Sequence, residues 1–480
     1  MRGFYLKNIG GKTKEYVWEG LFLLIVFGAE MSLAAVQMFG HPPDEFARFE
    51  VVYFIFRHGY LPTGYEIEVQ IGGYGGSYAF QPILTYIIQG YLMRFLNLFT
   101  DNIYILVLAA RMVNCVFGVI MAHYVRKISV LLWDSRLLQW LFTCLVVFLP
   151  ENIFIHSYIN TDSMAAMGIS VIIYAVLMGE KDDYGKKTAV TLSAGVSLVA
   201  LSYYNAYAAI LTALLAFIAH FARSGEYRKM WRKMGFIILL VSVMSGWWFI
   251  RSGILYNGDI LGLHARSLAT LTQAEAAYNP LTKKTFANTG RSVMDLLRSE
   301  YHTYVYHSFI CTMGAMDLPT KLVFYQIDKV LLALAAVLCI VPVKSSVVFW
   351  KDGRQKRTIE LLFAMDMIIT ASLHLLYSYA YDYQPQGRYL LPMLIPLMYF
   401  MTVGADKGGS LILRVLRGRY ARVGTAAVNA ARSAIVIYIL FSLFYAIMFC
   451  VLPYYRDTMQ EMKYISAVTF MQYLPQPMKY

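Results

Sequence analysis

The sequence predicts an all-α polytopic membrane protein, and three observations lead to this fold class. Of the 480 residues, 58% are hydrophobic and only 15% are charged, a combination that soluble proteins seldom reach. Several apolar runs of roughly 18 or more residues follow one another, and each is long enough to cross ~30 Å of hydrocarbon as a helix. The positive charge is concentrated in alternate segments between these runs. Mean hydropathy over the chain is +0.51.

We expect about eleven transmembrane helices, the first of them a signal anchor. This first run starts near Val17, follows Lys7, Lys12 and Lys14, and has no small-residue cleavage site after it, so it is predicted to remain uncleaved. An amphipathic or re-entrant helix is expected over 80–99, in the long loop after the first span. The spans are placed at 17–39, 103–123, 137–150, 162–179, 188–204, 206–222, 234–252, 326–343, 359–377, 389–404 and 433–453.

The distribution of Lys and Arg predicts the side on which each loop lies. More than half of the 42 Lys and Arg residues lie in the N-terminus and in segments 124–136, 180–187, 223–233, 344–358 and 405–432. These segments are expected to be cytoplasmic, because Lys and Arg are retained on that side. Loops 40–102, 151–161, 253–325 and 378–388 are then external. The net charge of +13 therefore reports topology and contact with anionic lipid heads, and it does not predict a nucleic-acid partner.

Some kinds of chemistry find no support in the sequence. It has no GxxxxGK[ST] motif, so no P-loop nucleotide site is predicted. The five cysteines mostly lie inside apolar runs and have no CxxC spacing, which argues against a disulfide framework or a zinc site. Any chemistry is expected on the external side of the membrane, without ATP, because the unusual polar residues lie in the external loops.

Asp44 and Glu45 are the first candidate catalytic residues. They follow Pro42 and Pro43 directly after the first span and precede an amphipathic pattern. One interpretation is helix initiation, since proline opens helices and acidic residues stabilise their first turn. The other is catalysis: a positioned carboxylate takes the proton from an attacking hydroxyl. In that interpretation Asp44 is the base, and Glu45 orients the acceptor or binds a metal.

Asp162 is the second candidate, in the sequence Asn160-Thr161-Asp162. Asn160 or Thr161 suits a helix N-cap and Asp162 the first turn. Alternatively, Asp162 is a second catalytic carboxylate that faces the first across an external cavity, because a charge at the edge of a span is costly unless it is paired or hydrated. Asn160 would then bind sugar hydroxyls.

Arg388 is the third candidate, in Gln386-Gly387-Arg388-Tyr389. It stands on the side that is poor in cations. It is either a salt-bridge partner of Asp382 beside an interfacial tyrosine belt or a clamp for a lipid phosphate, since the guanidinium fork matches phosphate oxygens. Arg251 is a weaker candidate for the same role or an interface anchor.

Metal binding stays open at this stage. His41 lies close to Asp44 in the sequence, but a single histidine with no defined partner is weak evidence. His302 and His307 are five residues apart and do not share a helix face. A divalent cation, Mg²⁺ or Mn²⁺, is therefore neither required nor excluded, and no other cofactor is expected.

The external motifs together resemble the GT-C fold of large membrane glycosyltransferases, closest to the bacterial branch related to protein O-mannosyltransferases and lipid A aminoarabinose transferases. The resemblance extends to about residue 400. It rests on Pro43-Asp44-Glu45, Gln81-Pro82-Ile83-Leu84, Asn160-Thr161-Asp162, the stretch 247–259, Ser308-Phe309 with Gly314, and Gln386-Gly387-Arg388-Tyr389 with Leu391-Pro392.

The resemblance implies an inverting glycosyltransferase that moves a sugar from a polyprenyl-phosphate donor to an acceptor hydroxyl at the extracytoplasmic face of the plasma membrane. It implies donor-phosphate contacts from Arg388 and Arg251. It also implies substrate contacts from Asn160, Gln386, Tyr389 and Gln81. The acceptor is a glycan, lipid or protein. A transporter or flippase of polyprenyl-linked saccharides, and a polymerase or ligase of such saccharides, are the alternatives.

Two parts of the chain follow from this resemblance. Residues 1–404 are expected to form the GT-C-like transmembrane catalytic domain, with external loops 40–102 and 253–325. Residues 405–480 are expected to contain a basic cytoplasmic loop, the last transmembrane helix and an external tail that begins near residue 454.

Overall fold

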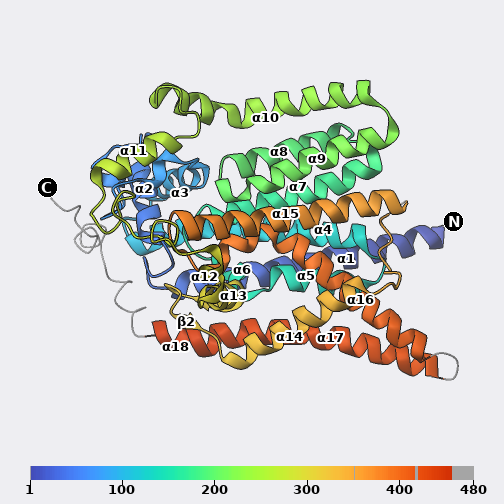
Figure 1. Cartoon of the computed structure of the whole chain (residues 1–480). Coiled ribbons are helices and arrows are strands. Elements are labelled where there is room, and N and C mark those ends of the chain that lie inside the picture. The colour runs from blue at the N-terminus through green and yellow to red at the C-terminus, as the bar shows by residue number, and fades with distance from the viewer. Residues whose placement is uncertain (1, 351, 417–419, 457–480) are drawn as a thin grey trace.

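Long apolar helices make up most of the structure, a computed structural model that describes residues 2–350, 352–416 and 420–456 (Figure 1). Within these residues, nine helical segments are long and apolar enough to cross a membrane. The first, Tyr16–Val36, is part of α1 (Arg2–Val36), and the others contain α4 (Ile103–Leu132), α7 (Asp162–Asp182), α9 (Tyr207–Ser224), α10 (Tyr227–Leu255), α14 (Leu322–Ile340), α15 (Gly353–Ala380), α16 (Leu394–Val415) and α17 (Ala421–Tyr445).

The other two predicted spans are also helical but shorter. They correspond to α5 (Arg136–Val147) and α8 (Lys186–Ala200). All eleven predicted segments therefore coincide with helices, and the expected all-α polytopic membrane fold is confirmed. Local polar residues start several of these helices. Asn102, Ser135 and Asp352 each accept a hydrogen bond from a backbone N–H in the first turn of α4, α5 and α15.

The helix α7 lies in the middle of the bundle. It packs against α4, α8 and α9, and 89% of the residues in its apolar stretch are buried. Small residues allow α7 and α8 to approach closely: a Cβ at Gly168 would lie 2.8 Å from Val199, and one at Gly195 would lie 2.9 Å from Ile172. In α10 and α14, by contrast, only 11% of the residues in the apolar stretch are buried. These two helices therefore present most of their surface to lipid.

The short elements gather at one end of the bundle, on the left in Figure 1, and α1 begins at the other end. They include α2 (Glu45–His58), η1 (Ile67–Val69), η2 (Tyr78–Phe80), α3 (Leu84–Leu96), α6 (Pro150–Ile155), α11 (Leu263–Gln273), α12 (Val293–Arg298), α13 (Tyr301–Cys311) and the antiparallel pair β1 (Thr312–Met313) and β2 (Leu318–Pro319). Two short 3₁₀ segments, η3 (Tyr204–Ala206) and η4 (Gly387–Met393), precede α9 and α16.

The helix α3 confirms the amphipathic helix expected within 80–99. Its inner face packs against α2, where Gly90 lies so close that a Cβ would be 2.8 Å from Ile55. Its outer face exposes Ile88, Tyr91 and Phe95. An exposed apolar face on a helix at the end of a membrane bundle is typical of a helix lying in the interface.

The C-terminal region differs from the expectation. The segment 405–432 was predicted to be a loop, but α16 continues to Val415 and α17 already begins at Ala421. Its Ala and Arg content explains this, because both are strong helix formers. The proposed domain boundary at 404 thus falls inside α16. The chain then continues through η6 (Ala446–Val451) and α18 (Leu452–Tyr455), and most of the predicted external tail lies outside the described residues.

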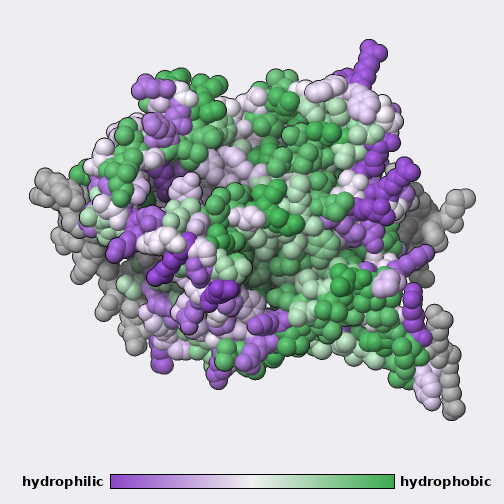
Figure 2. Space-filling view, in the orientation of Figure 1, coloured by the Kyte–Doolittle hydropathy of each residue, from purple (hydrophilic) through white to green (hydrophobic). Residues whose placement is uncertain are grey.

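The surface has the polarity of a membrane protein. Figure 2 shows apolar side chains over the middle of this face, with hydrophilic residues at the left end and along the right edge. An apolar band between two polar rims matches the hydrocarbon core of a bilayer.

Candidate functional site

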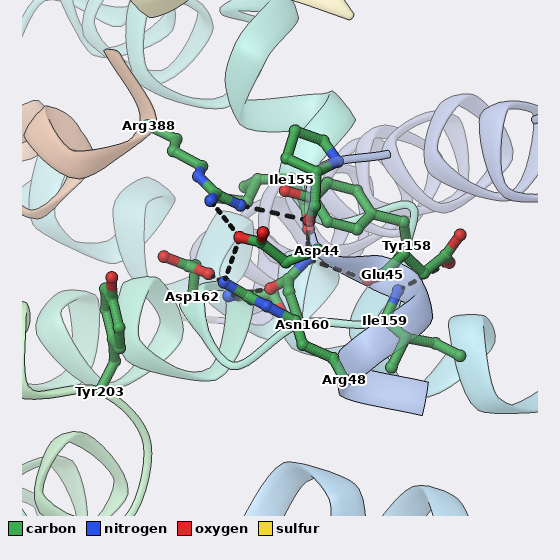
Figure 3. A network of polar contacts seen from close by, with 12 residues as sticks. Asp44, Glu45, Arg48, Ile155, Tyr158, Ile159, Asn160, Asp162, Tyr203 and Arg388 are labelled. Atoms are coloured by element: carbon green, nitrogen blue, oxygen red, sulfur yellow. Dashed lines mark hydrogen bonds and ion pairs between the residues drawn. The ribbon is translucent and has the colours of Figure 1, made fainter. Parts of the chain in front are cut away.

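A group of four charged side chains, three of them buried, lies where three distant turns of the chain meet at the loop-rich end of the bundle (Figure 3). Asp44 and Arg48 come from the start of α2, Asp162 from the first residue of α7, and Arg388 from η4. We call these four residues the Asp44 cluster. Three of the predicted site residues, Asp44, Asp162 and Arg388, are thereby brought together.

Asp44 has an unusual backbone conformation for a non-glycine residue. It is the N-cap of α2 with φ 61° and ψ 4°, and its side chain makes no capping hydrogen bond. The carboxylate instead accepts a hydrogen bond from Nη2 of Arg388 at 2.5 Å. Left-handed conformations of non-glycine residues carry a modest strain that surrounding contacts must offset. Asp44 therefore stands at the start of α2 as the helix interpretation expects, but its side chain contacts a residue 344 positions away instead of capping the helix.

Arg48 connects the two aspartates. Its Nη1 donates to Asp162 at 2.8 Å, and its Nη2 lies 3.7 Å from the carboxylate of Asp44. The guanidinium also lies over the ring of Tyr78, 5.3 Å from the centroid. The side chains of Arg48, Arg388 and Asp162 are 2%, 3% and 7% exposed, whereas that of Asp44 is 39% exposed. Asp44 is thus the member that a ligand can reach from solvent.

The charges of the cluster determine the protonation of Asp44. Burial of its surroundings acts to raise the pKa of the Asp44 carboxyl, but the guanidinium groups of Arg388 and Arg48, with hydrogen bonds from Arg388 and Tyr78, lower that pKa overall. Asp44 is therefore ionised at neutral pH. Two carboxylates alternate with two guanidinium groups, so the charges of the cluster are balanced.

Glu45 lies next to Asp44 but points the other way, as Figure 3 shows. It is fully buried, and Arg111 of α4 donates to both its oxygens, at 2.8 and 2.6 Å. Gly40 and Ile159 add backbone N–H donors at 3.0 and 3.1 Å. Each oxygen already accepts two hydrogen bonds. The geometry thus argues against the predicted acceptor or metal contact, because Glu45 of α2 joins the turn after α1, α4 and the turn before α7.

Asn160 also has a structural role in this geometry. Its amide donates to the carbonyls of Ile155 and Tyr158, at 2.7 and 2.9 Å, and its oxygen accepts from the N–H of Ser163 at 2.9 Å. Both ends of the side chain are engaged, so the predicted contact with sugar hydroxyls has no support here. The capping interpretation fits, because Asn160 satisfies the first turn of α7 and so holds Asp162 in place.

Arg388 is positioned by a close contact between η4 and α13. The N–H of Gly387 donates to Ser308 Oγ at 2.6 Å. A Cβ at position 387 would collide with the backbone of Phe309 and lie 2.5 Å from the carbonyl oxygen of Val305. Only glycine therefore allows η4 to approach α13 closely enough to place Arg388 beside Asp44.

We expect Gly387→Ala to separate η4 from α13, and so to lower both the thermal midpoint of the purified protein and any activity that depends on Arg388. The atoms that a Cβ at position 387 would meet belong to the backbone of α13, which cannot move aside as the end of a flexible side chain could. Gly72→Ala is the matched control, because Gly72 lies at the same end of the molecule and a Cβ there meets nothing within 4 Å. Equal thermal midpoints for the two variants would contradict the packing argument.

The remaining predicted residues lie around the cluster or away from it. The Tyr389 hydroxyl accepts from Arg388 at 3.2 Å. Gln386 donates to Gln384 at 2.8 Å, and Gln81 ends η2 three residues after Tyr78. Arg251 is not part of the cluster: it donates to Pro62 O at 2.7 Å and lies over Trp248. Its predicted phosphate contact is therefore not supported by its position.

Sequence reasoning missed two residues. Arg48 was not singled out, although an arginine at i+4 from Asp44 in a cation-poor loop was a usable signal. Glu151, in α6, is 4% exposed, and one of its oxygens has no partner among the described residues. Burial raises the pKa of Glu151 to about 8, against the opposing effect of a backbone hydrogen bond from Thr312 and the charge of Arg388. A carboxyl group of this kind is largely protonated at pH 7.

The cluster does not suit a divalent cation. Arg48 stands between Asp44 and Asp162, where a bridging metal would have to bind. Among the residues that the structure describes, no group of three or more His, Cys, Asp and Glu side chains is arranged to hold a metal. His41, which the sequence left open as a metal ligand, contacts Tyr455 and lies 2.9 Å from Asp317. We therefore derive no chemical step from a metal.

The helical bundle with its loop-rich end is a GT-C fold, the fold of large membrane glycosyltransferases, as expected from the motifs. No family model and no curated protein matches the sequence. Among solved structures, the chain is similar to ArnT from Cupriavidus metallidurans bound to undecaprenyl phosphate, with a TM-score of 0.51 and 14% identity, covering 96% of this chain and 77% of that one.

A second similar structure is the Archaeoglobus fulgidus oligosaccharyltransferase in complex with Zn and sulfate. The TM-score is 0.50 at 10% identity, and the match covers 95% of this chain and 57% of the archaeal one. This chain thus spans less than two thirds of the oligosaccharyltransferase. At these identities the likeness establishes the fold, and the activity has to be argued from the site.

Proposed function

We propose that the protein is an inverting glycosyltransferase that uses a polyprenyl-phosphate sugar donor at the extracytoplasmic face of the cell membrane. The observation that carries the proposal is Asp44: a partly exposed, ionised carboxylate held between two buried guanidinium groups, at the polar end of a membrane-spanning bundle. A base and a phosphate-binding cation then stand side by side where a lipid headgroup meets water.

Asp44 is proposed to accept the proton of the acceptor hydroxyl. The hydroxyl oxygen attacks the anomeric carbon from the face opposite the phosphate. The bond between that carbon and the phosphate oxygen breaks, and its electron pair leaves on the lipid phosphate. Inversion follows because a single displacement occurs.

Arg388 is proposed to bind the donor phosphate. Its Nη2 pairs with Asp44, its Nη1 makes a 3.3 Å contact with the Pro43 carbonyl, and its Nε has no partner among the described residues. A phosphate bound to Arg388 would partly neutralise the positive charge that lowers the pKa of Asp44. Donor binding would therefore raise the pKa of Asp44 and make it a better base.

The test is a transfer assay with the full chain in lipid vesicles and a series of labelled polyprenyl-phosphate sugars. Release of polyprenyl monophosphate with formation of a glycosylated acceptor supports the proposal. Movement of intact labelled lipid between leaflets would indicate the flippase. Release of a diphosphate carrier would indicate the polymerase or ligase.

Replacing Arg388 by Lys is expected to raise the donor KM by about tenfold or more, because the charge stays but the two-point fork is lost. Arg251→Lys is the matched control, since Arg251 binds the carbonyl of Pro62 outside the cluster. Initial rates over a range of donor concentrations measure both variants. An unchanged donor KM in Arg388→Lys would remove Arg388 from phosphate binding.

The pH dependence of transfer follows from the lowered pKa of Asp44. The base form persists below the ordinary carboxyl pKa of about 3.9, so kcat/KM is expected to stay flat from about pH 7 to pH 5 and to fall only as the pH drops through the lowered value. The acid limb of kcat, which reports the donor complex, should lie at higher pH. Arg388→Gln should move the acid limb of kcat/KM upward. A wild-type limb above about pH 6 would contradict the assignment of Asp44.

A further inference from the structure

A cavity lies on a different face of α13 from the one that contacts η4. It has a volume of about 350 Å³ and is lined by His302, Thr303, Tyr306 and His307 of α13 and by Leu322, Tyr325, Gln326 and Lys329 of α14. The face of α13 that holds η4 consists of Val305, Ser308 and Phe309. The cavity therefore shares no residue with the Asp44 cluster, although α13 contacts η4, the element that holds Arg388.

Hydrogen-bond donors and one cation surround this cavity. Lys329, Gln326 and His302 are exposed, and His307 is half-buried with its ring stacked on Tyr325 at 4.1 Å. Burial, followed by the charge of Lys329, lowers the pKa of His307, so its imidazole is neutral at pH 7. The cavity thus offers a positive charge and neutral donors without a carboxylate among its lining residues.

Lys329 needs a partner where it stands. It lies seven positions after Leu322, the first residue of α14, which is about 10 Å along the helix axis. Lys283 pairs with Asp382 and Lys356 with Glu360, but Lys329 has no such carboxylate partner in the part of the chain that the structure describes. A lysine on a lipid-facing helix is stabilised by reaching the headgroup level or by pairing with an anion.

The surroundings favour an anion that belongs to a lipid. Val330, Leu334 and Val337 are exposed apolar residues of α14 that follow Lys329 toward the middle of the helix, and α14 presents most of its surface outward. Acyl chains lying along them would leave the head group at the cavity. A metal is disfavoured, because Lys329 would repel it.

We propose that this cavity binds the phosphate of a membrane lipid head group, with Lys329 pairing with the phosphate and His302 and Gln326 donating hydrogen bonds. The rings of Tyr306 and Tyr325 form its walls. This lipid site is separate from the proposed catalytic site and does not depend on the transferase activity. Phosphate oxygens are the acceptors that a Lys and several neutral donors match.

The test uses the full chain purified in detergent and native mass spectrometry, with phosphatidylglycerol and diacylglycerol as probes. Retention of phosphatidylglycerol but not of diacylglycerol is expected, and Lys329→Gln should reduce that retention about tenfold. Lys321→Gln is the matched control, because Lys321 is exposed at the start of the same helix but does not line the cavity. His302→Ala is the second variant, with a smaller loss expected.

Three outcomes would overturn the proposal. Equal retention of the two lipids would mean that no phosphate is recognised. An equal loss in Lys321→Gln would indicate nonspecific charge attraction. Displacement of phosphatidylglycerol by inorganic phosphate, but not by sulfate at the same ionic strength, would make free phosphate the ligand. The thermal midpoint of each variant is measured as well, and an unchanged midpoint shows that the variant is folded.

Discussion

Asp44→Asn is expected to reduce sugar transfer by about 10²–10⁴-fold, the contribution typical of a positioned general base. The amide keeps the size of the side chain but cannot accept the hydroxyl proton. Asp44 is 39% exposed, so the variant should still accumulate in membranes, although Arg388 loses an ionic partner. Initial rates of label transfer in vesicles, at equal protein, measure the effect.

Glu68→Gln is the matched control for this variant. Glu68 is an exposed carboxylate at the same end of the protein and also pairs with a basic side chain, His58, at 2.7 Å. Its loss should leave transfer within about twofold of the wild type, as surface ion pairs contribute little. If Asp44→Asn transfers sugar at the wild-type rate, Asp44 is not the base, and Glu151, with its raised pKa, becomes the next carboxyl to test.

Glu45→Ala is expected to destabilise the protein by about 3–5 kcal/mol, the cost of leaving one partner of a buried ion pair uncompensated. The variant strands the buried guanidinium of Arg111 and leaves two backbone N–H donors, at Gly40 and Ile159, without their acceptor. Thermal unfolding in detergent and the yield of folded protein measure the loss.

Two controls separate this structural role from a catalytic one. Glu19→Gln alters a half-buried pair between α1 and His123 of α4, the helix that also holds Arg111, and should cost less than about 1 kcal/mol. Glu45→Leu combined with Arg111→Met should recover part of the stability, since no charge is left unpaired. A Glu45→Ala protein that is as stable as the wild type but inactive would return Glu45 to the reaction.

The helices could be predicted from the sequence almost completely. The eleven apolar segments coincide with helices, because length and hydrophobicity are local properties that the bilayer selects directly. The segment 405–432 was mispredicted because its charge suggested a loop, whereas charged residues such as Arg are good helix formers. The interfacial helix α3 was recognised because its apolar and polar faces alternate at the helical period.

The candidate site could be predicted only in part. Asp44, Asp162 and Arg388 were found because charged residues at the ends of apolar spans are costly and therefore informative. Asn160 and Arg251 were assigned substrate contacts because a sequence motif does not reveal which hydrogen bonds a side chain has already made. Arg48 was missed since its partner Asp162 lies 114 residues further along the chain.

The sequence by itself determined the apolar helices, the polar end of the bundle and the presence of acidic residues there, since each depends on residue type and spacing along the chain. Only the tertiary structure decided that Asp44 faces Arg388 and Arg48 while Glu45 faces Arg111. Adjacent side chains at the start of a helix point in different directions, so a difference of one residue separates an accessible carboxylate from a buried structural one. Which cation each meets depends on contacts between segments far apart in the chain, and these form only when the helices pack.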